Sequence, residues 1–116
     1  MSPKRLDRVA PPPTKDEWDV RFGTTEAAKG WQDLCSKATN STRDAFELMR
    51  SDPRPPEDLT HYRLRGEFRS RHFGGKQLEQ WQIKIGNSGR IWYLPDDESH
   101  TVWVVYASPA HPKETE

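Results

Sequence analysis

Cysteine is almost missing from this 116-residue chain, which contains Cys35 alone. One thiol cannot form an internal disulfide, so the fold must hold together without that crosslink. Cys35 falls on the apolar stripe of a predicted helix, and a small buried thiol is the ordinary expectation there.

Long apolar runs are missing as well. No segment approaches the roughly 20 apolar residues that are needed to span a bilayer. Residues 1–13 are polar and proline-rich, whereas a secretory signal needs an apolar segment at this place. We therefore expect a cytosolic protein without a membrane span.

The chain also lacks a net charge, because its 18 basic side chains balance its 18 acidic ones. That balance argues against an indiscriminate binder of polyanions. The charges are spread unevenly, however: residues 61–92 hold seven basic and two acidic side chains, a net charge of +5. A basic patch of this kind is typical of nucleic-acid contact, and a solvated sheet face is the alternative.

Hydrophobic residues make up only 32% of the chain, but five Trp, four Phe and three Tyr supply large units of buried area. The length fits one domain. Residues 1–15, with four prolines among charged side chains, predict a disordered or extended arm. The folded domain is expected over residues 16–116.

Apolar spacing predicts one strand and then two helices in the first half of the domain. Alternation over residues 18–22 indicates a short half-buried strand. Thr24 or Thr25 can cap a first amphipathic helix. The residues Asn40-Ser41-Thr42 offer a cap for a second helix, which Asp52-Pro53 ends.

The second half reads as β-structure after a proline-rich loop at residues 53–58. Strands are expected at 61–69, 80–85, 90–94 and 102–106, with residues 72–76 as a flexible turn. The last strand is apolar on both faces, which is typical of an interior strand. The predicted order is β-α-α-β-β-β-β, an α+β fold with an antiparallel-rich sheet against a two-helix hairpin.

Period-2 alternation also predicts which side chains leave the core. In the strand after the loop, His61, Arg63 and Arg65 should point outward together. His72 is likewise expected at the surface. In the next strand Lys84 should point outward, while Trp81 and Ile83 point inward.

Three stretches resemble the RelE/ParE-like toxins of bacterial type II toxin–antitoxin pairs, and the resemblance covers roughly residues 16–116. HYRLRG (61–66) is similar to the family's strand that ends in a basic residue and a glycine. EQWQIKIGNSGRIWYL (79–94) is similar to its paired strands, in which an Arg follows the turn glycine. VWVVYASPAHPKETE (102–116) is similar to its final strand and His/Lys tail.

The resemblance implies a RelE-like fold and an activity found in many members, which cleave messenger RNA in the ribosomal A site without a metal and so inhibit translation. By position, Arg65 and Arg90 would clamp the scissile phosphate, since the guanidinium fork pairs with phosphate oxygens. His111 would be the general acid or base, because its ordinary pKa lies near working pH. Lys113 would assist with charge or proton transfer.

Arg63 and Lys84 would hold flanking phosphates, which position the RNA without reading its bases. Arg65 and Arg90 could instead be solvated, or paired with Glu67 and Glu79. The implied partners are a cognate antitoxin, messenger RNA and the ribosome, with no cofactor and no metal. A ParE-like inhibitor that binds DNA gyrase, or a catalytically silent interaction module with the same fold, are the alternatives.

Overall fold

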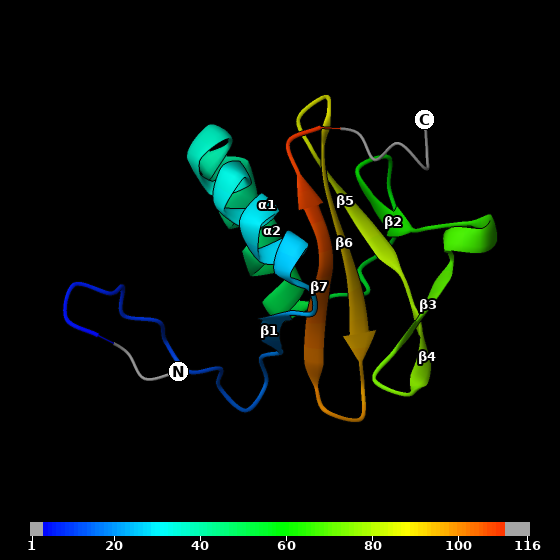
Figure 1. Ribbon diagram of the computed structural model, residues 1–116. Helices are drawn as coiled ribbons and strands as arrows, with labels where there is room; N and C mark the ends of the chain where they lie inside the picture. Colours follow the sequence, from blue (N-terminus) through cyan, green and yellow to red (C-terminus); the bar gives the residue numbers. More distant parts are fainter. Residues whose placement is uncertain (1–3, 111–116) are drawn as a thin grey trace.

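The computed structural model describes residues 4–110, so the predicted site residues His111 and Lys113 lie outside the described residues. It shows two helices on one face of a five-stranded sheet and a small hairpin beside that sheet (Figure 1). The helices are α1 (Thr25–Lys37) and α2 (Thr39–Ser51). The strands of the main sheet are β1 (Asp19–Phe22), β2 (His61–Arg63), β5 (Trp81–Ile85), β6 (Gly89–Asp96) and β7 (Thr101–Ser108).

The strands of this sheet lie in the order β1-β7-β6-β5-β2. Only β1 runs parallel to its neighbour, and the other pairs are antiparallel. Taken with the two helices, the main sheet follows the predicted β-α-α-β-β-β-β order, and the α+β class is confirmed. The doubly apolar strand β7 is interior, as predicted, between β1 and β6.

Helix α1 begins where the sequence predicts, since Thr24 Oγ1 accepts a hydrogen bond of 3.0 Å from the Ala27 amide. Helix α2 begins at Thr39, earlier than the predicted cap. Thr39 Oγ1 donates to the Cys35 carbonyl at 2.6 Å and Thr42 Oγ1 to the Leu34 carbonyl at 3.2 Å. These hydroxyls bind carbonyls in the last turn of α1, and no side chain caps α2.

Cys35 is exposed, and the prediction of a buried thiol was wrong. The buried stripe of α1 passes through Ala27 and Leu34. Because successive helical residues are turned by about 100°, Cys35 lies beyond the edge of that stripe. Neither helix in residues 4–110 is long and apolar enough to cross a membrane.

A second hairpin was missed: residues read as a flexible turn form β3 (Ser70–Phe73) and β4 (Lys76–Glu79). Gly74 and Gly75 join the two strands with φ of 60° and 83°, a conformation that suits a two-residue hairpin turn. The strand expected to reach residue 69 ends at Arg63 and gives way to a 3₁₀ turn at Gly66–Phe68.

The sheet therefore carries apolar residues on both faces. A helix-side cluster fills the space between the sheet and α1 and α2, with Ile91 and Tyr93 fully buried. A hairpin-side cluster is built on Leu64, Trp92, Leu94 and Val105, and side chains of β3 and β4 pack against it. This second layer also covers Gln82, which is buried.

His61 was expected at the surface, but it is buried, with 4% of its surface exposed. Its ring contacts Trp81 and Tyr93, and its Nε2 is hydrogen-bonded to Tyr93 Oη. Tyr93 Oη donates to the Pro53 carbonyl at 2.7 Å. A carbonyl only accepts, so the tyrosine proton is used there and His61 Nε2–H must be the donor.

Glycine at position 30 is required by the contact between α1 and β7. A Cβ at Gly30 would lie 1.6 Å from the Ala107 carbonyl oxygen. We expect Gly30→Ala to destabilise the fold by about 1–3 kcal/mol or more, because the helix must move off the sheet. In an exposed helix the same change would stabilise by about 1 kcal/mol.

Urea unfolding of both forms measures this difference. Lys29→Ala, at the exposed neighbouring position, is the control and should change the unfolding free energy by less than about 0.5 kcal/mol. A Gly30→Ala chain as stable as the parent would contradict the packing described.

Burial lowers the pKa of His61 below its ordinary value of 6.5, although Asp58 and Asp52 act in the opposite direction. The unfolded chain therefore binds this proton more readily than the folded one. The contribution of His61 to the free energy of unfolding should be fully present above about pH 7.5 and should decrease as pH falls through 6.5. The loss amounts to about 1.4 kcal/mol for each unit by which the pKa of His61 is lower in the folded chain than in the unfolded one.

Unfolding free energies at pH 7.5 and 5.5 test this expectation. His61→Gln should remove the part of the pH dependence due to His61, whereas His72→Gln, at an exposed position of β3, should leave it unchanged. An equal pH dependence in the parent and His61→Gln would contradict the assignment.

Candidate nucleic-acid interface

The candidate site lies on the sheet face opposite the helices, at the end formed by the β5–β6 turn. Side chains directly opposite one another on neighbouring strands share a face of the sheet. Two such rows cross this face. The first row consists of Lys84, Arg90 and Ser108, and the second of Tyr62, Gln82, Trp92 and Tyr106.

The second row is held together by one buried amide. Gln82 Nε2 donates to Tyr62 Oη at 2.8 Å, and Gln82 Oε1 accepts from Trp92 Nε1 at 2.7 Å. The Trp92 and Tyr106 rings lie 5.3 Å apart between centroids. Gln82 thus fixes two aromatic rings at once and gives the row a defined shape.

Lys84 connects the two rows, because its Nζ lies 5.6 Å from the centroid of the Tyr62 ring. Such a cation–π contact holds the ammonium group near the surface without neutralising its charge. Lys84 is half-buried and Tyr62 is half-buried, so both reach solvent at this face.

Arg90, which the resemblance assigns to the scissile phosphate, is buried. Only 5% of its surface is exposed. Its Nη1 donates to the Gly89 carbonyl at 2.8 Å and to the Asn87 carbonyl at 3.3 Å. The guanidinium therefore holds the β5–β6 turn as well as contributing positive charge to the first row.

Arg63 and Arg65 lie toward the opposite end of β5. Arg63 is the cross-strand partner of Trp81, three residues from Lys84, which is roughly 10 Å along a strand. Its guanidinium donates to the Arg69 carbonyl at 3.2 Å and to Ser70 Oγ at 3.3 Å. Arg65 is exposed and forms an ion pair of 2.8 Å with Glu57.

The structure thus brings Lys84 and Arg90 together and leaves Arg63 and Arg65 apart from them. The end of the described chain comes to the Lys84–Arg90 row: Ser88 Oγ donates to the Pro109 carbonyl at 2.7 Å, and the Ala110 amide to Ser108 Oγ at 3.0 Å. Among residues 4–110, no group of three His, Cys, Asp or Glu side chains could hold a metal ion.

Sequence reasoning missed the roles of Tyr62, Gln82 and Tyr106 at this face. The signal that could have found them is register. A turn at Asn87-Ser88-Gly89 pairs Gln82 with Trp92, and the β6–β7 pairing then adds Tyr106. The hairpin-side layer, against which Tyr62 and Tyr106 pack, was not foreseen.

No family model matches this chain, and no curated protein matches it. One solved structure that is similar is the crystal structure of the toxin–antitoxin complex RelBE2 from Mycobacterium tuberculosis. The similarity covers 84% of this chain and 95% of the matched chain, at 22% sequence identity and a TM-score of 0.48.

Replacing Gln82 tests whether its amide holds the second row together. Gln82→Leu should destabilise the fold by about 1–3 kcal/mol, because it leaves the buried Trp92 indole N–H without its acceptor. Urea unfolding followed by tryptophan fluorescence measures the change. Gln77→Leu, at an exposed position of β4, is the control and should be nearly neutral. Equal effects of the two substitutions would show that the amide does not hold the row.

Proposed function

We propose that this chain is the toxin of a bacterial toxin–antitoxin pair and acts in the cytoplasm as a metal-independent endoribonuclease. Its substrate is messenger RNA, cut at the ribosome, and translation stops as a result. The observation that carries the proposal is that Lys84 and Arg90 of the first row lie beside the aromatic rings of the second row on one sheet face.

Single-stranded RNA is held by cations on its phosphates and by aromatic rings on its bases. Lys84 supplies an accessible cation, and Tyr62 and Tyr106 are half-buried rings on either side of the buried Trp92. The two rows lie two residues apart along the strands, roughly 7 Å, so one nucleotide can meet both. A solvated sheet face needs neither the rings nor their fixed geometry.

The chemistry needs three groups. A 2′-hydroxyl must lose a proton, the phosphorane must have its negative charge balanced, and the 5′-oxygen must gain a proton as it leaves. Arg90 and Lys84 balance the charge, and charge placed in advance is commonly a large catalytic term. His111 takes or gives the proton and Lys113 assists, since the chain reaches this row at Ala110.

Arg65 and Arg63 take flanking phosphates in this proposal. Both lie toward the far end of β5 from Arg90, and Arg63 is the cross-strand partner of Trp81, whose side chain is in the helix-side cluster. They would therefore meet a flanking nucleotide that passes the edge strand β2, and not the reacting one. The antitoxin is proposed to cover the same basic segment, residues 61–92, with an acidic stretch, since charge complementarity speeds encounter.

Expression in a bacterial host tests the proposal. The parent should arrest growth and cut messenger RNA. His111→Ala should slow cleavage by about 100-fold or more, because it removes general acid–base catalysis. Lys84→Ala should weaken RNA binding, whereas Lys37→Ala, an exposed lysine on α1, should behave like the parent. Protein that has been treated with EDTA and then freed of it should still cleave on ribosomes kept in Mg²⁺ buffer.

Gyrase supercoiling is measured in parallel. Inhibition of supercoiling without RNA cleavage would replace the proposal with a ParE-like binder. Expression of folded protein without any growth effect would replace it with an interaction module.

A further inference from the structure

Strand β1 is an edge strand, and within residues 4–110 no strand pairs with its outer edge. Asp19 N–H donates to the His100 carbonyl and Gly23 N–H to the Val104 carbonyl, so alternate backbone groups of β1 face β7. Val20 and Phe22 lie between these positions, and their N–H and C=O groups therefore point away from the sheet. An edge of this kind is a template for another strand.

The chain's own arm cannot fill this edge. Glu17 N–H donates to the Thr14 carbonyl at 3.0 Å, which closes a turn just before β1. A hairpin continuing from that turn would place Pro13, Pro12 and Pro11 beside β1, and proline has no N–H to donate. The arm therefore passes β1 without pairing to it.

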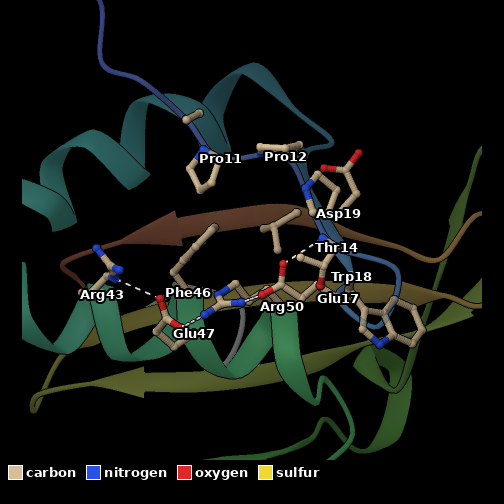
Figure 2. Close-up of a pocket in the computed structure, with 13 residues that line it drawn as sticks. Pro11, Pro12, Thr14, Glu17, Trp18, Asp19, Arg43, Phe46, Glu47 and Arg50 are labelled. Atoms are coloured by element: carbon tan, nitrogen blue, oxygen red, sulfur yellow. Dashed lines mark hydrogen bonds and ion pairs between the residues drawn. The ribbon is translucent and has the colours of Figure 1, made fainter.

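A hollow of about 520 Å³ remains between the arm, β1 and α2. Figure 2 shows Pro11 and Pro12 on one side of it and Phe46, Glu47 and Arg50 of α2 on the other. Arg50 is ion-paired with both Glu17 and Glu47, and Arg43 with Glu47 at 3.0 Å. The arginines and glutamates that line the hollow are therefore ion-paired with one another, and the rest of its lining is mainly apolar.

A second, smaller cavity of about 200 Å³ continues along the same edge. Val20 and Phe46 line both spaces, and Phe22 and Trp31 line the second one. Phe22 is 47% exposed, although its ring meets Trp31 edge to face. The open edge is therefore flanked by pockets for apolar side chains.

The first part of the arm offers what this edge lacks. Leu6 is 90% exposed and Val9 is 97% exposed, and residues 4–9 lie away from the body of the protein on the β1 side (Figure 1). Residues 4–9 contain no proline, so each can donate to a strand. In the single chain Asp7 N–H donates to the Lys4 carbonyl at 3.0 Å and Leu6 has a φ of 80°, so this turn must open before Leu6–Val9 can pair. Once extended, these four residues match the four residues of β1 in length.

One antiparallel register between Leu6–Val9 and β1 places opposite charges across from one another. In an antiparallel register that places Asp7 opposite Arg21, Leu6 comes opposite Phe22 and Arg8 opposite Val20. Leu6–Phe22 and Arg8–Val20 then lie on the helix side. Asp7–Arg21 and Val9–Asp19 lie on the other side, where Arg21 already meets Asp19 at 2.5 Å. Opposite charges and apolar pairs across strands both stabilise a sheet.

We propose that two copies of this chain exchange arms, so that Leu6–Val9 of each copy lies along β1 of the other. The prolines at 11–13 keep each arm off its own β1 and present it to the partner. Leu6–Val9 of one copy would bind in the hollow of the other, between β1 and residues 11–13 of that other copy. This assembly does not depend on the proposed ribonuclease activity.

Sedimentation velocity on the full chain, from about 1 to 100 µM, tests the proposal. The parent should form a dimer in a concentration-dependent manner. Asp7→Arg and Arg21→Asp should each raise the dissociation constant at least about tenfold, because each places like charges opposite one another. The double variant restores the opposite charges and should recover the dimer. Asp33→Arg, on the exposed side of α1, is the control and should dimerise like the parent.

A crosslink identifies the contact. In a Cys35→Ser background, a Leu6→Cys chain mixed with a Phe22→Cys chain should give a disulfide-linked heterodimer. A parent that stays monomeric at every concentration would overturn the proposal. So would a dimer that ignores both charge reversals, or a folded double variant that fails to regain the dimer.

Discussion

The close contact of α1 with the backbone of β7 sets the position of everything else in the molecule. At Gly30 no side chain separates the helix from the Ala107 carbonyl. Ala107 faces the helices, and its neighbours Tyr106 and Ser108 therefore face the other side. The helices therefore cover the face that holds the helix-side cluster, and the two rows of the candidate site form on the face that the helices leave uncovered.

The basic character of residues 61–92 is weaker in three dimensions than along the chain. Lys76 is paired with Asp96 and Glu98, and Arg65 with Glu57. These carboxylates come from outside the segment. These pairs neutralise the positive charge of Lys76 and Arg65. Lys84 and Arg90, in contrast, lie next to one another in the first row. Segment charge could locate a basic segment but could not identify the pairs that neutralise part of it.

The main sheet and both helices could be predicted because each has a regular apolar period. The β3–β4 hairpin could not, since Ser70–Phe73 and Lys76–Glu79 hold few apolar side chains and their burial depends on Trp92 and Trp103 beneath them. His61 was misplaced because its partner, Tyr93, lies 32 positions away. Alternation showed that His61 and Tyr62 face opposite sides, but it could not show that both sides are covered.

For the candidate site, Lys84 could be placed from alternation alone. The burial of Arg90 depends on carbonyls that turn toward it in the Asn87–Gly89 turn, and no sequence period reports their direction. Tyr62, Gln82 and Tyr106 come from three strands, so only strand order and register bring them together. The catalytic roles of Arg65, His111 and Lys113 remain predictions from resemblance.

Strand β6 is buried along all eight of its residues. A strand with two covered faces and two paired edges leaves no position where a side chain can change without disturbing a layer. Tolerance must therefore concentrate where this strand ends, in the exposed turn Asp97–His100 that leads to β7. Within that turn Asp97 is ion-paired with Arg54 and the His100 ring stacks on Trp18, so the tip at residues 98–99 is the natural place to insert a reporter.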